Sequence, residues 1–140
     1  MKEVTIIRRE RFCSAHKLWN PQWDEEKNEA VFGGCSNPNW HGHNYELFVK
    51  VAGEIDSETG FVMNLKTLSK ILKTKVINKL DHKNLNLDVD FLQGKTTTTE
   101  QLAVSIWEEI EKEINEQGAR LTSVTINETE NNSVEYFGEK

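Results

Sequence analysis

Histidine is the residue type that points most directly to chemistry in this sequence. The four histidines stand at positions 16, 41, 43 and 82, and two of them form the motif His41-Gly42-His43. If that motif lies in a strand, its two imidazoles project from one face, and His16 ends an earlier strand-like segment that can lie beside it. Three imidazoles without a fourth protein ligand are typical of catalytic zinc. The spacing leaves open the alternative that each ring is an ordinary surface or hydrogen-bonded histidine.

A second candidate group joins Cys35 to Asp81 and His82. Cys35 stands in the loop that leads into the histidine motif, whereas Asp81-His82 follows a predicted helix. A thiol acts as a base or nucleophile where a histidine or a cation lowers its pKa, and Asp81 can orient such a histidine. The alternative is an inert loop thiol and a turn pair. We expect Cys13, at odd spacing from His16, to be a small buried packing residue and not a metal ligand.

Acidic and hydroxyl side chains near the end of the sequence form a third group. Glu128 and Glu130 lie at the end of a predicted strand. An ionised carboxylate that accepts two parallel N–H bonds can hold a guanidine-like edge, such as that of a pterin or guanine ring. The alternative is a solvated acid beside a turn, and the threonine run 96–99 is explained by helix capping without any ligand.

Four predicted strands and two predicted helices must position these groups. Periodicity predicts strands at 3–16, 44–54, 120–128 and 133–138, and helices at 64–79 and 100–117. We expect Thr97 and Glu100 to form a capping box before the second helix, and Gly118 to end it. This order predicts an α+β fold, an antiparallel four-stranded sheet with both helices on one face (β-β-α-α-β-β). The opposite face then needs other cover, for which another subunit is one candidate.

The long connection between the first two predicted strands is expected to be functional. It spans residues 17–39 and contains three large aromatic side chains, which argue against disorder. A charged stretch at 24–29 is the candidate for a short helix within it.

Length and composition limit the number of domains and the kinds of partner. The chain has 140 residues and a formal charge of −6, which predicts a single domain over 1–140 with little room for a deep enclosed pocket. Acidic residues spread along the chain argue against a nucleic acid partner. Two cysteines, no signal-like apolar core and no run of 18 apolar residues predict a cytoplasmic protein without a membrane span.

Six segments together resemble the 6-pyruvoyltetrahydropterin synthase family from end to end. These segments are FCSAHKL, FGGCSNPNWHGHNYE, GEIDSETGFVMNL, LDHKNLNLDVDF, TTTTEQLAVSIW and NETENNSVEYFGE. The resemblance implies a T-fold whose sheets join into barrels, in homohexamers built from two trimers. It also implies a lyase of tetrahydrobiopterin biosynthesis, which converts 7,8-dihydroneopterin triphosphate into 6-pyruvoyl-tetrahydropterin and releases triphosphate.

The resemblance assigns a role to each candidate residue. The ligands of the family's Zn²⁺ cofactor correspond to His16, His41 and His43. The proton-abstracting thiol and its activating relay correspond to Cys35, Asp81 and His82. The acid that anchors the pterin ring and the residues beside it correspond to Glu128, Thr98 and Thr99. Because the chain leaves little room for a deep pocket, we expect the site to lie between subunits.

The spacing of Cys35 bears on which product is formed. A close branch, the 6-carboxytetrahydropterin synthases of queuosine synthesis, uses the same zinc and substrate but has a Cys-x3-His-Gly-His motif. Here five residues separate Cys35 from His41, as in the pyruvoyl synthases. Gly34 and Trp40 depart from the Lys and Gly that are common in the family. The alternatives are therefore the carboxy product, or a non-catalytic pterin-binding oligomer of the same fold.

Overall fold

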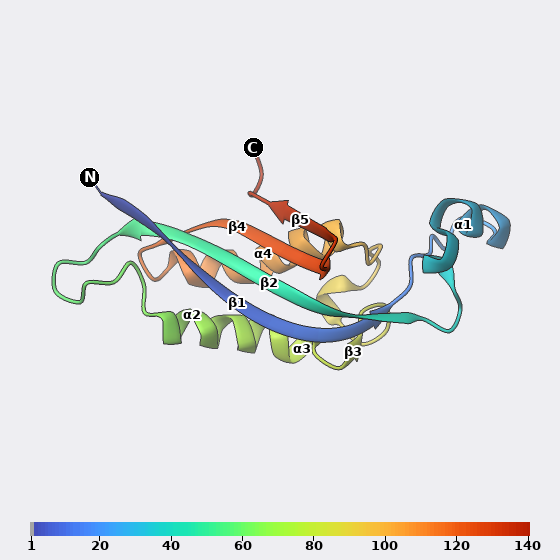
Figure 1. Cartoon of the computed structure of the whole chain (residues 1–140), viewed down its shortest axis with the longest axis horizontal. Helices are drawn as coiled ribbons and strands as arrows, with labels where there is room; N and C mark the ends of the chain where they lie inside the picture. The colour runs from blue at the N-terminus through green and yellow to red at the C-terminus, as the bar shows by residue number, and fades with distance from the viewer. Residues whose placement is uncertain (1) are drawn as a thin grey trace.

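Two long strands with alternating side chains organise the fold. In the computed structural model, which describes residues 2–140, β1 (Glu3–His16) and β2 (His41–Glu54) pair antiparallel over their whole lengths. β2 also pairs with β4 (Arg120–Thr129), and β4 pairs with β5 (Asn132–Tyr136), both antiparallel. Figure 1 shows this curved sheet as one layer, with the principal helices forming the other. The α+β class predicted from the sequence is confirmed.

Helices cover one face of the sheet. α2 (Leu65–Leu72), a π-helical turn (Lys73–Ile77) and α3 (Asn78–Leu80) form one helical run against β1, and α4 (Thr99–Asn115) packs on β4 and β5. The residues of β2 that face them are buried, as are most apolar residues of α2 and α4. This core includes Tyr45, Leu47, Val49, Leu68, Leu72, Leu102, Ile106 and Ile110. Both helices therefore lie on one face, as the periodicity predicts.

The number of strands and one helix cap differ from the sequence prediction. A short strand, β3 (Lys83–Asn84), pairs parallel to β1 at Ser14 and Ala15, so the sheet is mixed and has five strands in the order β3-β1-β2-β4-β5. Two residues are too few to show a period in the sequence.

The N-cap of α4 is Thr98, whose Oγ1 accepts the Gln101 N–H at 3.2 Å, so the predicted Thr97–Glu100 capping box was wrong by one residue.

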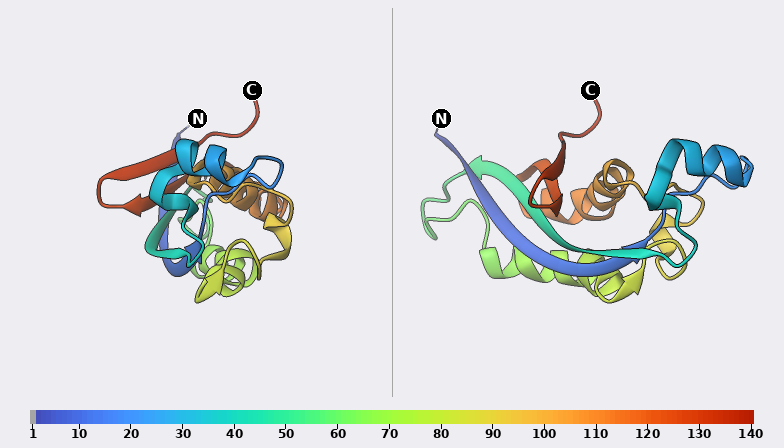
Figure 2. Two further views of the ribbon diagram at one scale, coloured as in Figure 1. Left: turned by 90° about the vertical axis from the view of Figure 1, so that its right-hand side faces the viewer. Right: turned by 45° about the vertical axis from the view of Figure 1, so that its right-hand side comes forward.

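The connection between β1 and β2 forms a small lobe beyond the end of the sheet. It contains the predicted short helix, α1 (Glu25–Phe32), followed by a 3-10 turn at Gly33–Ser36. Figures 1 and 2 show α1 set apart from the other helices. The fully buried Asn28 bonds the lobe together, because its side chain accepts the Asn20 N–H and donates to the carbonyls of Asn20 and Asp24.

The face of the sheet opposite the helices is polar. Arg9 pairs with Glu46 at 3.2 Å, and Lys50 pairs with Glu135 at 3.0 Å. Cys13 also lies here and is exposed, so the prediction that it is buried was wrong. Its neighbours Phe12 and Ser14 are buried on the helix side, and alternation along β1 directs position 13 the other way.

No helix within residues 2–140 is long and apolar enough to cross a bilayer.

Candidate metal centre and adjoining pocket

The strand pairing brings three histidines together. His16 lies opposite His41 at the last pair of the β1–β2 ladder, and His43 follows two residues along the same face of β2. One nitrogen from each ring lies within 4.8 Å of the others, and the ring centroids are 4.5 to 5.2 Å apart. β2 begins at His41, three residues before the predicted start of this strand. The His-Gly-His motif is therefore part of the strand itself.

The surroundings of His16 and His41 favour their neutral imidazoles, and a hydrogen bond fixes which nitrogen of His16 keeps its lone pair. His16 is buried, and burial lowers its pKa to about 4. Its Nδ1 lies 2.8 Å from the Thr97 carbonyl, which can only accept, so Nδ1 carries the proton and Nε2 keeps its lone pair. Burial also lowers the pKa of His41.

One atom of the cluster is unsatisfied without a ligand. His41 Nδ1 is buried and has no hydrogen-bond partner among residues 2–140. Buried polar atoms without partners are rare, and metal binding is one explanation of such an atom. Three imidazoles also match the donor set of an open zinc site. The residues present therefore fit a zinc ion.

Tyr45 forms the floor beneath the histidines. It is fully buried two residues after His43 on the same face of β2, and it stacks on Phe12 with a centroid distance of 4.8 Å. Its hydroxyl lies 3.5 Å from His16 Nε2, and burial raises the pKa of that hydroxyl. The sequence analysis did not identify Tyr45, although its spacing of two from His43 was a usable signal.

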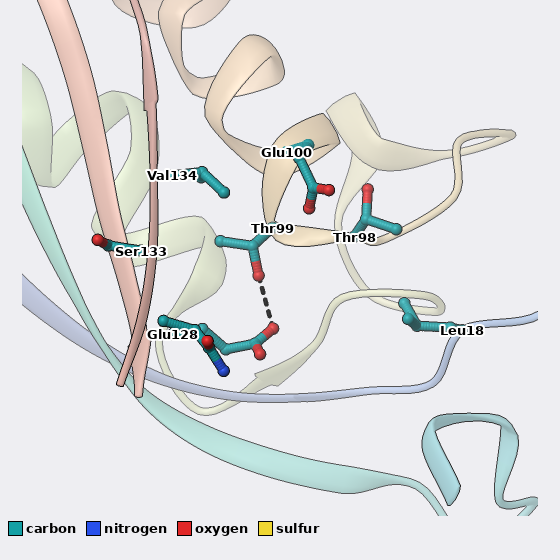
Figure 3. Close-up of a pocket in the computed structure, with 8 residues that line it drawn as sticks. Leu18, Thr98, Thr99, Glu100, Glu128, Ser133 and Val134 are labelled. Carbon is teal, nitrogen blue, oxygen red and sulfur yellow. Dashed lines mark hydrogen bonds between the residues drawn. The ribbon is translucent and has the colours of Figure 1, made fainter. Parts of the chain in front are cut away.

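A surface cavity of about 370 Å³ adjoins the histidines and contains all three predicted substrate-binding residues. Figure 3 shows Thr98 and Thr99 at the start of α4, with Glu128 of β4 facing Thr99. Glu128 Oε2 accepts a hydrogen bond from the Thr99 hydroxyl at 2.5 Å and lies 3.9 Å from His43 Nε2. A carboxylate therefore both lines the cavity and lies near the histidine cluster.

Asp81 and His82 form a pair on the edge of the sheet. His82 Nδ1 lies 3.0 Å from Asp81 Oδ2, and Asp81 Oδ1 accepts the backbone N–H of Cys13 at 2.8 Å. That N–H lowers the pKa of Asp81. The His82 side chain is 81% exposed, so its ring is open to an approaching group.

Cys35 is not joined to this pair. It lies in the lobe and is exposed, and its carbonyl accepts the Leu18 N–H at 2.7 Å. Within residues 2–140 no hydrogen bond links Cys35 to Asp81 or His82. A single chain therefore contains the predicted thiol, Cys35, and the predicted relay, Asp81 and His82, but does not bring them together.

Trp40, next to His41 of the histidine cluster, has an unusual backbone conformation. Its φ is 67°, in the left-handed region that glycine adopts without strain. Its ring holds the Lys17 ammonium at 4.7 Å, and Lys17 also lies 5.3 Å from the Trp19 ring. Such cation–π contacts contribute about 0.5–1 kcal/mol at exposed sites, which helps to offset the strain.

Comparison with known proteins gives matches along nearly the whole chain. The family model described as 6-pyruvoyl tetrahydropterin synthase matches residues 5–139. Two proteins named 6-pyruvoyl tetrahydrobiopterin synthase match, one from Dictyostelium discoideum at 44% identity over 99% of this chain and 98% of the relative, and one from Homo sapiens at 42% over 98% and 93%. The solved structure of Caenorhabditis elegans 6-pyruvoyl tetrahydropterin synthase superposes with a TM-score of 0.93 at 36% identity, covering 99% of this chain and 98% of that one.

Proposed function

The chain belongs to the 6-pyruvoyl tetrahydropterin synthase family, and we propose that it converts 7,8-dihydroneopterin triphosphate into 6-pyruvoyl-tetrahydropterin as a zinc-dependent lyase. The observation that carries this proposal is the convergence of three imidazoles beside a cavity that Glu128 and Thr99 line. A metal centre and a binding site for a ring with N–H donors lie side by side, as the reaction requires.

The cavity residues have distinct roles in this proposal. Glu128 accepts N–H bonds from the guanidine-like edge of the pterin ring, and the Thr99 hydroxyl holds the carboxylate in place. Thr98 lies beside it as the N-cap of α4. With the ring anchored there, the side chain of the substrate extends toward the histidines.

The metal would be held by His16, His41 and His43. Bound zinc acidifies hydroxyl groups and stabilises negative charge that develops on oxygen. The protein's own part is to hold the substrate side chain beside the three histidines and to remove its carbon-bound protons.

Cys35 removes those protons, and the Asp81–His82 pair activates it. Asp81 fixes His82 through Nδ1, which leaves the other ring nitrogen free to take the proton of a thiol. A C–O bond to triphosphate breaks as the protons leave, and the redox change stays within the substrate, so no nicotinamide is consumed.

Free thiols of this kind suit a reducing compartment, and we place the protein in the cytoplasm.

The separation of Cys35 from His82 within one chain supports a site shared between subunits. We propose a homohexamer of two trimers whose sheets join into barrels, with the relay of one chain reaching the thiol of its neighbour. The exposed ring of His82 on the sheet edge suits such a contact.

Mixing two inactive variants tests the shared site. Cys35→Ala and His82→Ala should each be inactive alone, whereas oligomers formed by co-expressing equal amounts should regain about a quarter of the parental activity, since a quarter of randomly assembled sites receive both intact residues. Triphosphate release, measured per chain, gives the result.

A matched pair provides the control. Co-expression of Cys35→Ala with His41→Ala tests whether the thiol and the metal ligands come from one chain. That pair should stay inactive, because every chain then lacks one of two residues that must act together. If the Cys35→Ala and His82→Ala mixture also stays inactive while it assembles normally, the relay is not shared between subunits.

A further inference from the structure

The loop after β3 is fixed against the end of β1. Leu85 is fully buried and its N–H donates to the Ala15 carbonyl at 2.8 Å. The side chain of Asn84 accepts the Asn86 N–H at 2.9 Å, which turns the chain sharply. This turn places the Asn86 side chain beside Lys17, the residue that follows His16.

Asn86 pairs with the backbone of Lys17 at two points. Its Oδ1 accepts the Lys17 N–H at 3.1 Å, and its Nδ2 donates to the Lys17 carbonyl at 3.0 Å. The amide thus continues the hydrogen bonding of β1 beyond the last strand residue. The backbone immediately after His16 is held on both of its polar groups.

Thr97 connects this pairing to the imidazole. Thr97 is buried, and its hydroxyl lies 3.1 Å from Asn86 Oδ1 and 3.2 Å from the Lys17 carbonyl oxygen, so its one proton is donated to either acceptor. Its own carbonyl accepts the Nδ1–H of His16 at 2.8 Å. Three segments that are distant in sequence meet here, namely the end of β1, the loop after β3 and the segment before α4.

We propose that Asn86 and Thr97 are positioning residues that hold His16 in the Nδ1–H tautomer, with its Nε2 lone pair directed at the metal. The Asn86 amide and the Thr97 hydroxyl fix the backbone of Thr97, and the Thr97 carbonyl fixes the ring. This inference rests on the metal site of the proposed function, and it assigns a metal-affinity role to two side chains that touch neither the three histidine rings nor the substrate cavity.

Hydrogen-bond partners outside the ligand set orient metal-binding histidines. Loss of such a partner typically weakens metal affinity about 10- to 100-fold. We therefore expect Thr97→Val, which removes the hydroxyl and keeps the side-chain shape, to bind zinc about tenfold more weakly or worse. Thr97→Ser, which keeps the hydroxyl, should bind zinc as the parent does. Asn86→Ala should resemble Thr97→Val.

Two measurements on each variant test the proposal. Zinc affinity is measured by competition with a chromophoric chelator, and the tautomer of His16 in the metal-free protein is read from its imidazole nitrogen chemical shifts. Asn64→Ala is the matched control. It also removes a side-chain oxygen that accepts a backbone N–H, from Lys66 at 2.9 Å, but it does so at the start of α2, away from the histidines.

The outcomes separate this inference from the proposed function. Weaker zinc binding and a mixed tautomer in Thr97→Val and Asn86→Ala, with both properties unchanged in Thr97→Ser and Asn64→Ala, support it. Parental affinity and a single tautomer in folded Thr97→Val overturn it. If the parent itself binds no zinc, the metal centre of the proposed function fails, and the tautomer measurement still decides the role of Thr97 and Asn86.

Discussion

Replacing Cys35 by alanine should abolish triphosphate release and leave zinc bound. The thiol is the proton-abstracting group of the proposed reaction, and loss of a positioned acid or base costs about 10²- to 10⁴-fold in rate. Cys35 lies in the lobe, outside the group of three histidines that would hold the metal. Zinc content by atomic spectroscopy and triphosphate release by a coupled phosphate assay measure the two effects on one sample.

Cys13→Ser is the control for this prediction. Cys13 is the other cysteine, and it is also exposed, but its side chain lies on the polar face of the sheet, away from the helices. We expect this variant to keep nearly parental activity. Full activity in Cys35→Ala would contradict the assignment of the thiol, and loss of zinc in that variant would show that Cys35 is itself a ligand.

Replacing His41 by alanine should remove both zinc and activity. Two imidazoles would remain where a catalytic zinc needs three protein ligands, so the metal would be held far more weakly. His41 also contributes the buried nitrogen that has no other partner among residues 2–140. The fold should survive, because His41 begins β2 at the edge of the core and is not part of it.

His82→Ala is the control that shows whether the loss of any histidine removes zinc. It removes an imidazole that lies outside the group of three, so zinc should stay bound while activity falls. The account of the metal site would be wrong if His41→Ala kept about one zinc per chain, or if His82→Ala lost it.

The long elements could be predicted from the sequence because their periodicity reports burial directly. The alternation in 3–16 gave the bounds of β1 as the structure has them, Glu3–His16. The placement of His41 and His43 on one face followed from the same period-2 rule, whereas the position of His16 opposite His41 depends on the pairing of β1 with β2. β3 could not be predicted, since its two residues form a strand only because the buried Leu85 holds the loop against β1.

Features that depend on backbone groups could not be predicted from the sequence. The Thr97 carbonyl that orients His16 belongs to a residue whose side chain suggested only a helix cap. The prediction that Cys13 is buried failed because odd spacing from His16 places its side chain on the polar face of the sheet. In the proposed assembly Cys35 meets His82 of a neighbouring chain, and the fold of a single chain does not contain that contact.

The central claim is tested most directly by identifying the product. Zinc-loaded protein is incubated with 7,8-dihydroneopterin triphosphate, and the pterin product is identified by mass spectrometry while released triphosphate is measured. The account predicts 6-pyruvoyl-tetrahydropterin with one triphosphate released for each pterin formed. Formation of 6-carboxytetrahydropterin with acetaldehyde, or binding of the pterin with no triphosphate released, would contradict it.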